Sequence, residues 1–250
     1  MPMILHTVIR DCLYLNWAIP VEAVPALPEP LRVEAHGEGS RREAFVSAVL
    51  FRQEELHHEL APFLQLAYPQ CNLRLYVRDG DDIASVFFLR MLVPAWVVAG
   101  ARLVGHQPAM AASLDFPPRG LGADLDAWRW SVAAGSALRL EAQPGAGAPG
   151  PGPDLGSWQK AVAYFRERPR GYGLLGGRLR RVEAFHPTVE HAPVRVAVTE
   201  TSLLAEALPD ADPALWLRPH SAFLCPRVPF AFDLGTSVRE ALPAHLPAPG

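Results

Sequence analysis

Prolines set the strongest limit on what this chain can fold into, because 26 of its 250 residues are proline. That share is roughly double the usual value of about 5%. A proline ring fixes φ and removes a backbone hydrogen-bond donor, so a proline inside a helix breaks it. Long helices are therefore not expected, and short strands joined by turns are favoured.

Between the prolines, apolar residues recur mostly with the spacing of strands. Leu73, Leu75 and Val77 alternate with polar residues, and Asp-Gly-Asp-Asp at 79–82 predicts a turn into a returning strand. The expected strands are 45–52, 72–78, 83–90, 128–132, 137–141, 172–182, 194–199 and 222–232. The expected helices are 94–104, 157–166 and 201–208. Many strands with few short helices predict a mainly β domain of the α+β class.

Two stretches of the chain have the composition of linkers. Residues 143–156 are nearly all proline, glycine and alanine, and residues 242–250 are similar. Such sequences form no regular element. We therefore expect a single domain over residues 1–241, with a flexible loop at 143–156 and a disordered tail at 242–250.

Charge and cysteine content narrow the compartment and the partners. The formal net charge is −3, so the chain offers no basic field to nucleic acid or anionic lipid. The three cysteines are far apart and form no disulfide or zinc pattern. The start of the chain does not resemble a signal peptide, and the longest apolar run, 91–101, is shorter than the about 20 residues of a membrane span. These features predict a cytoplasmic protein with neither a nucleic-acid nor a membrane partner.

Two motifs have both a purely structural and a functional interpretation. Gly171–Gly176 matches the G-x-G-x-x-G pattern, but a dinucleotide site needs a strand before it and a helix after it, so a glycine-rich turn is favoured. Residues 54–59 hold three glutamates and two histidines. Carboxylate-bridged metal bundles need two Glu-x-x-His motifs, and one copy favours a solvated charged segment.

A third motif could supply metal ligands, because His186, Glu190 and His191 lie close together in the sequence. Pro187 and Pro193 prevent a regular helix, so the spacing has no fixed geometry. We assign no metal residues here.

The predicted strand 72–78 presents four polar side chains on one face: Asn72, Arg74, Tyr76 and Arg78. Such a face must meet either solvent or a polar cavity, and both remain open. Guanidinium groups bind carboxylates through two parallel hydrogen bonds. Arg102 lies within an apolar stretch and needs a partner if it is buried.

Several segments, taken in order, resemble the YqjF-like family of uncharacterised proteins. They are 10–20 (RDCLYLNWAIP), 45–52 (FVSAVLFR), 72–78 (NLRLYVR), 86–89 (VFFL) and 101–103 (ARL), and more loosely Tyr164-Phe165, Arg168, 177–179 and the stretch around His186. The resemblance covers roughly residues 6–233. This family is similar to acetoacetate decarboxylase, which implies a strongly curved, barrel-like β-structure around an internal cavity, with a few peripheral helices.

The resemblance does not carry over the decarboxylase mechanism. That enzyme uses a Schiff-base lysine after a Gly-x-Pro turn, whose counterpart here is Gly105–Pro108, followed by Ala109 and Met110. Arginine cannot replace the lysine, because its pKa stays too high to give a neutral amine. The only lysine is Lys160, on a predicted helix beside the linker. We therefore expect no acetoacetate decarboxylation, and no cofactor is implied.

The leading hypothesis is a protein that binds a small carboxylate or keto-acid in the internal cavity. Arg74 and Arg102 would anchor the charge, and Asn72 and Tyr76 would supply hydrogen bonds. His106 is the candidate general acid or base, since imidazole titrates near neutrality. Whether the protein is an enzyme stays open.

Two alternatives belong to other functional classes. The first is a non-catalytic homo-oligomer or interaction module, which would use the exposed-looking apolar residues Phe223, Leu224, Phe230 and Phe232. The second is a metal-dependent enzyme built on His186 and His191.

Overall fold

The computed structural model describes residues 3–39, 42–118, 128–145, 155–187, 190–234 and 237–241. Strands dominate this part of the chain, which confirms a mainly β protein of the α+β class. The strands are β1 (Ile4–Pro20), β2 (Arg32–Val33), β3 (Ala35–His36), β4 (Glu43–His58), β5 (Leu66–Arg78), β6 (Ala84–Val93), β7 (Ala109–Ala111), β8 (Ser113–Asp115), β9 (Trp128–Ala134), β10 (Ser136–Pro144), β11 (Arg170–Leu175), β12 (Arg178–Phe185), β13 (Ala192–Glu200), β14 (Ser221–Asp233) and β15 (Ser237–Ala241). The helices are α1 (Ala95–Leu103), α2 (Trp158–Arg166) and α3 (Ser202–Ala207), with 3-10 turns η1 (Val21–Ala23) and η3 (Pro213–Leu217).

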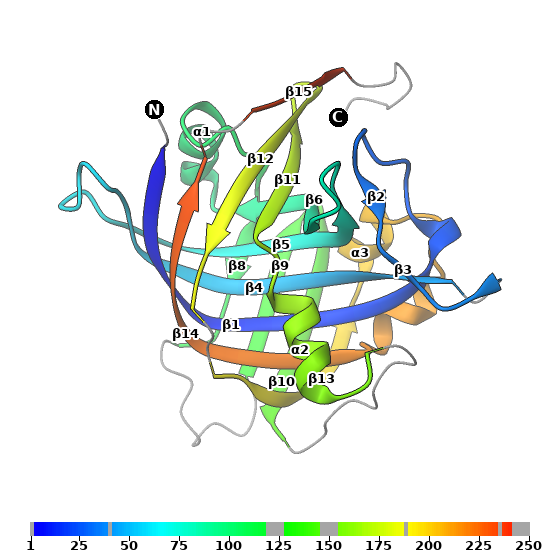
Figure 1. Cartoon of the computed structure of the whole chain (residues 1–250). Helices are drawn as coiled ribbons and strands as arrows, with labels where there is room; N and C mark the ends of the chain where they lie inside the picture. The colour runs from blue at the N-terminus through cyan, green and yellow to red at the C-terminus, as the bar shows by residue number, and fades with distance from the viewer. Residues whose placement is uncertain are drawn as a thin grey trace.

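Seven strands form a closed barrel. Their order is β12-β11-β6-β5-β4-β1-β14, and a further pairing of β14 with β12 completes the ring. The pairing of β11 with β6 is parallel, and the other six pairings in the ring are antiparallel. Figure 1 shows β1, β4, β5 and β14 running across the barrel, with β11 and β12 crossing above them. Closure removes the open edges of these strands and encloses an interior.

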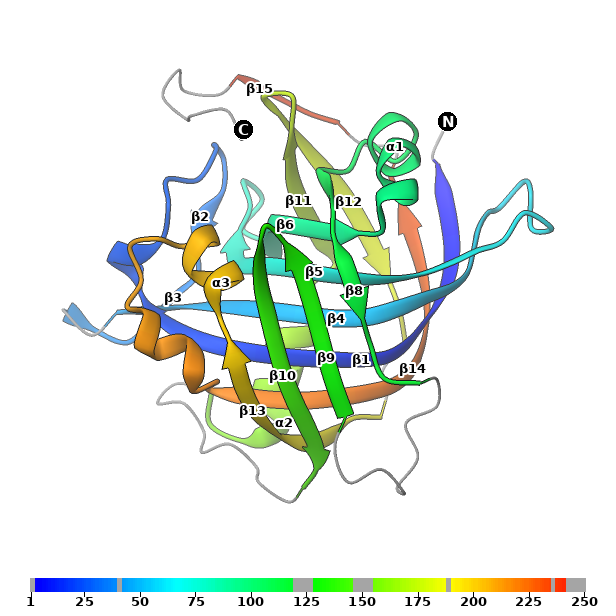
Figure 2. The ribbon, with the colours of Figure 1, turned by 180° about the vertical axis from the view of Figure 1, so that it is seen from behind.

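A second layer covers one side of the barrel wall. From β14 the sheet continues through β13, β10, β9 and β8, and Figure 2 shows β9 and β10 lying across β5, β4 and β1. The main apolar core fills the space between the two layers. Leu13, Leu50 and Leu73 enter it from the wall, and Trp130 and Leu140 enter it from the covering layer. The wall strands β1, β4 and β5 therefore bury both of their faces.

Two helices border the barrel, and Figure 1 places α1 near its top and α2 near its bottom. Ser157 caps the start of α2, where its hydroxyl accepts a hydrogen bond from the Lys160 amide at 3.3 Å. Val162 and Phe165 of this helix pack in a second core cluster with Phe45 and Phe223. None of the described helices is long and apolar enough to cross a membrane.

Most of the expected elements are present, and three expectations need correction. The strand expected at 172–182 is a hairpin of β11 and β12, which turns at Gly176 and Gly177 with φ of +57° and +73°. The segment 54–59 is largely the end of β4, and the expectation of a solvated segment was wrong for Glu54, which is buried and paired with Arg10, whereas Glu55 and Glu59 are exposed. Of the expected loop 143–156, the first two residues belong to β10, and 146–154 lie outside the described residues, as does the tail 242–250.

The glycines of the hairpin allow close packing against the barrel interior, and this predicts a stability difference. A Cβ at Gly171 would lie 2.7 Å from the Phe88 ring, whereas a Cβ at Gly100 of α1 would meet nothing within 4 Å. We expect Gly171→Ala to lower the free energy of unfolding by about 1–3 kcal/mol through overpacking. The matched change Gly100→Ala should raise it by about 0.5–1 kcal/mol, because alanine favours the helix.

Urea denaturation of the two alanine variants and the parent protein measures these differences. Equal stability of both variants would contradict the packing assigned to Gly171.

Candidate functional site

The barrel interior decides between the two environments left open for the polar face of β5. The opposite face, with Leu73 and Leu75, is fully buried in the main core. Residues that line the interior come from all seven barrel strands, and Asn72 and Arg74 are among them. Asn72 and Arg74 therefore meet the barrel interior and not solvent. Tyr76 is buried without lining a cavity, and Arg78 binds Glu34 and Asp82 near the end of the strand.

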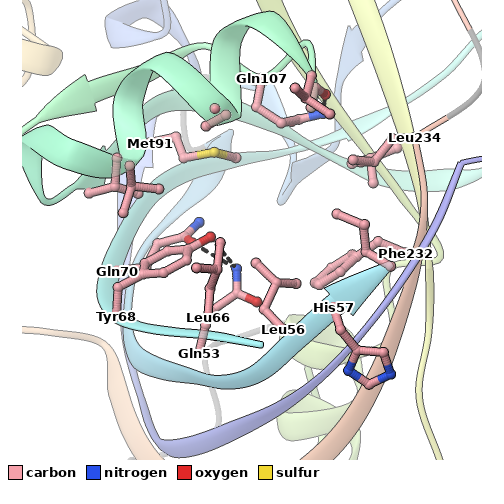
Figure 3. A pocket seen from close by; sticks show the side chains of 18 of the residues that line it. Gln53, Leu56, His57, Leu66, Tyr68, Gln70, Met91, Gln107, Phe232 and Leu234 are labelled. Carbon is pink, nitrogen blue, oxygen red and sulfur yellow. Dashed lines mark hydrogen bonds between the residues drawn. The ribbon is translucent and has the colours of Figure 1, made fainter. Parts of the chain in front are cut away.

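The larger of two cavities, about 370 Å³, lies beneath α1. Figure 3 shows Gln53, Tyr68 and Gln70 on one side of it, with Phe232 and Leu234 on another and Gln107 above. The three labelled polar side chains on the first side belong to β4 and β5, which pair so that Gln53 lies opposite Tyr68. Such a volume is in the range of small-molecule sites.

A row of hydrogen bonds runs along this side of the larger cavity. Gln53 donates from Nε2 to the Tyr68 hydroxyl at 3.1 Å and to Gln70 Oε1 at 3.0 Å. Gln70 in turn donates from Nε2 to Asn72 Oδ1 at 2.8 Å. The row ends at Asn72, whose Oδ1 is thereby occupied and whose Nδ2 group is left as a donor.

The smaller cavity, about 90 Å³, adjoins the first. Both are lined by the same five residues at their junction: Phe51, Asn72, Phe88, Val182 and Phe232. Beyond the junction the smaller cavity is lined by Arg74, Arg166 and Arg168. It is the more cationic end of a two-part interior space.

Arg74 is the cation in this interior that lacks a carboxylate. Its Nη2 group donates to the Tyr76 hydroxyl at 2.9 Å and to the Phe165 carbonyl, and its guanidinium lies 4.9 Å from the Tyr14 ring centroid. No ion pair involves Arg74 within the described residues, and its buried Nε has no hydrogen-bond partner there. Arg168, in contrast, is paired with Glu34.

The groups around Arg74 leave its charge uncompensated. Burial raises the pKa of the Cys12 thiol and of the Tyr14 hydroxyl well above their ordinary values, so both are neutral at pH 7. Burial also raises the pKa of the Cys225 thiol to about 11. Although burial acts to lower the pKa of Arg74 itself, Tyr76 and Tyr14 outweigh it and the net change is upward. The guanidinium therefore stays charged.

Tyr76 holds Arg74 and does not line either cavity. It is fully buried, and its hydroxyl lies 2.7 Å from Ser47 Oγ and 3.1 Å from the Phe165 carbonyl. Ser47 bonds to Asn16, which donates to Ser221 Oγ at 2.9 Å. This network of neutral groups fixes the Tyr76 hydroxyl behind the guanidinium, so Tyr76 is a positioning residue, not a direct ligand contact.

The structure does not bring Arg102 and His106 to the cavities. Arg102 is exposed on α1 and donates from Nε to the Ala109 carbonyl at 2.7 Å, so the expectation of a buried arginine was wrong. His106 is exposed with φ of +51°. In the turn that follows α1, Gly105 and Gln107 line the larger cavity while His106 does not.

Other candidates are also placed differently from the sequence hypotheses. Phe223 and Leu224 are buried, and Phe230 and Phe232 line the smaller cavity, so these residues do not form an exposed docking surface. Lys160 is exposed on α2 and lines neither cavity.

The two histidines of the third motif contact aromatic rings. His186 lies 4.6 Å from the Phe230 ring centroid, and His191 lies 6.0 Å from that of Trp158. Within the described ranges, no three His, Cys, Asp or Glu side chains are grouped to hold a metal ion.

Sequence reasoning missed Gln53, Tyr68 and Gln70. The signal that could have found them is the period-2 pattern of β4 and β5, since Gln53 and Gln70 continue the faces of Phe51 and Asn72.

Comparison with known proteins bears on the family and the fold. The family model DUF2071, "Uncharacterized conserved protein", matches residues 6–229. No curated protein matches the sequence significantly.

Two solved structures are similar over nearly the whole chain. The enduracididine biosynthesis enzyme MppR, complexed with the condensation product of pyruvate and imidazole 4-carboxaldehyde, has a TM-score of 0.58 and 11% identity over 95% of this chain and 89% of that one. An acetoacetate decarboxylase-like enzyme from Sphingomonas wittichii RW1 has a TM-score of 0.56 and 14% identity over 94% and 92%. These matches show the acetoacetate decarboxylase-like fold that the sequence resemblance implied.

Proposed function

The chain belongs to the DUF2071 family, and from that premise we propose that it binds a small carboxylate, of the keto-acid class, inside its barrel. The observation that carries the proposal is the uncompensated charge of Arg74 at the end of the space inside the barrel. A buried cation is costly unless it is paired, and a ligand carboxylate would supply the missing partner. The structural neighbour MppR has a solved structure complexed with pyruvate, a keto-acid, which supports the ligand class.

In this proposal Arg74 and Asn72 contact the ligand, and Tyr76 orients Arg74. The ligand carboxylate would accept hydrogen bonds from the Arg74 guanidinium. The keto oxygen beside that carboxylate would accept a hydrogen bond from Asn72 Nδ2. Arg102 and His106 take no part, because both lie outside the cavities. The proposal does not include acetoacetate decarboxylation, since the only lysine in the sequence is exposed on α2.

A reducing compartment such as the cytoplasm is part of the proposal. Cys12, Cys71 and Cys225 are all buried free thiols. Cys12 lies opposite Cys225 in the pairing of β1 with β14, and both line the smaller cavity. Free thiols are stable in the reduced cytoplasm.

A matched ligand pair tests the proposal. Isothermal titration calorimetry with a 2-oxo acid and with its neutral primary amide keeps the shape of the ligand and removes its charge. Hydrogen bonds to charged groups contribute about 1.5–3 kcal/mol, so the acid is expected to bind at least about tenfold more tightly.

A thermal-shift screen of short oxo, hydroxy and acyl acids provides the wider control. Ligand at a hundred times its Kd should stabilise the protein by about 2.7 kcal/mol. Equal affinity for acid and amide, or no shift with any acid, would contradict the proposal.

A further inference from the structure

The larger cavity has a mostly apolar lining, and its polar side chains are Gln53, Tyr68, Gln70 and Asn72 on one side together with His57, His58 and Gln107. Among the described residues its lining contains neither a carboxylate nor a lysine or arginine. The amides of Gln53 and Gln70 bond to each other, to Tyr68 and to Asn72. Within the described residues Gln53 Oε1 is the one atom of this row that is buried without a hydrogen-bond partner, and the row's own hydrogen bonds engage both amides and the Tyr68 hydroxyl without a ligand.

The sizes of the two cavities differ in a way that suits a ligand with two unlike ends. At about 30 Å³ for each water-sized group, the smaller cavity holds about three such groups and the larger about twelve. A carboxylate has three heavy atoms, so it matches the smaller cavity, which is the one that Arg74 lines. A three-carbon acid would leave most of the larger cavity unfilled.

The mouth of the larger cavity is apolar as well. Four of its lining residues are large hydrophobic side chains that are exposed to solvent: Leu64, Leu66, Trp96 and Val104. Leu64 lies between β4 and β5, whereas Trp96 belongs to α1. The β4–β5 connection and α1 therefore lie on either side of the opening. Figure 3 shows Leu66 and α1 on different sides of the cavity.

We propose that the ligand is an amphipathic organic acid, with its carboxylate at Arg74 and an apolar body that fills the larger cavity as far as this mouth. The inference rests on the proposed function and adds the chemistry of the remainder of the ligand. Asn72 and Phe88 line both cavities. The ligand therefore passes from the smaller cavity into the larger one beside these two residues. The apolar body gains free energy by leaving water for the apolar walls.

Affinity as a function of chain length tests the inference on the unmodified protein. Calorimetry with straight-chain 2-oxo acids of increasing length is expected to show Kd falling about threefold to fourfold for each added CH2 group until the cavity is full. A flat or rising Kd beyond three carbons, with the short acids still binding more tightly than their amides, would overturn the inference and leave the proposed function standing. Failure of every acid to bind would overturn both.

A matched pair of variants locates the apolar body. Val97 is buried and lines the larger cavity, whereas Leu103 of the same helix is exposed and lines neither cavity. Val97→Phe should remove the gain from added CH2 groups, and Leu103→Phe should leave the whole series unchanged. A full chain-length gain in a folded Val97→Phe protein would contradict the assigned position.

Discussion

Replacing Asp79 with alanine is expected to lower the free energy of unfolding by about 3–5 kcal/mol, because it removes a buried carboxylate that accepts four hydrogen bonds of at most 3.0 Å. The buried Tyr172 hydroxyl and two turn amides are left without that partner. Asp79 is 1% exposed. One carboxylate oxygen accepts from the amides of Asp81 and Ile83 at 3.0 and 2.9 Å, and the other accepts from Arg170 and the Tyr172 hydroxyl, both at 2.8 Å. The residue therefore ties the turn between β5 and β6 to β11, beside the parallel pairing of β6 with β11.

The same contacts predict how this contribution depends on pH. Burial alone would raise the pKa of the Asp79 carboxyl, but the hydrogen bonds from Arg170 and Tyr172 outweigh it and hold that pKa below its ordinary value. The folded state thus favours the ionised form, and its stabilisation is complete above the unfolded pKa of about 3.9. As the pH falls through the lower folded pKa, the stabilisation is lost and the difference between parent and variant narrows.

Asp81→Ala is the matched control for this prediction. Its side chain is largely exposed and also binds Arg170, so its loss should cost only about 0–1 kcal/mol. Urea denaturation of parent, Asp79→Ala and Asp81→Ala proteins at pH 7 and below pH 4 provides the measurement. A loss below 1 kcal/mol for Asp79→Ala at pH 7 would show that the turn is not held as described.

Arg74→Met is expected to separate binding from stability. Removing the charged hydrogen bonds should weaken the binding of a carboxylate about 10-fold to 100-fold. The free energy of unfolding should nevertheless stay within about 1 kcal/mol of the parent value, since the change removes an unpaired buried charge. The Tyr76 hydroxyl keeps Ser47 as a partner, and the Phe165 carbonyl keeps Tyr76.

Arg102→Met makes the same chemical change outside the cavities and should leave binding unchanged. Calorimetry and urea denaturation of both variants give the two readouts. An Arg74→Met protein that binds acids as the parent does, or that loses as much stability as Asp79→Ala, would contradict the role given to Arg74.

The strand 72–78 could be predicted from its alternating pattern, but the surroundings of its polar face could not. A polar face beside an apolar one is typical of a strand with one side in water. Here both faces of β5 are covered. One face packs under the second layer, and the other faces the inside of the barrel. Only the pairing of β14 with β12, which joins residues far apart in the sequence, encloses that interior.

Apolar composition predicted burial for a helix that is exposed and exposure for aromatic residues that are buried. The apolar stretch that contains Arg102 is a surface helix, in which Trp96 and Leu103 are exposed. The aromatic residues of β14, such as Phe223, looked available for a partner but face inward. Local composition does not specify which side of an element the rest of the fold covers, and here tertiary contacts decide it.

Gln53 and Gln70 illustrate what strand pairing adds. Neither residue belongs to a recognisable motif. They meet because β4 and β5 pair antiparallel, with Gln53 opposite Tyr68 and Phe51 opposite Gln70. A period-2 pattern assigns such residues to a face, whereas their contact depends on the register between the two strands.

The most direct test of the account is a nitrogen-15 NMR titration that observes the Nε–H group of Arg74, assigned by its disappearance in Arg74→Met. Addition of a 2-oxo acid is predicted to shift this resonance and to saturate it with the same Kd that calorimetry gives, while the Arg102 resonance stays in place. Saturable heat of binding without any change in the Arg74 resonance would contradict the central claim that this guanidinium receives the carboxylate.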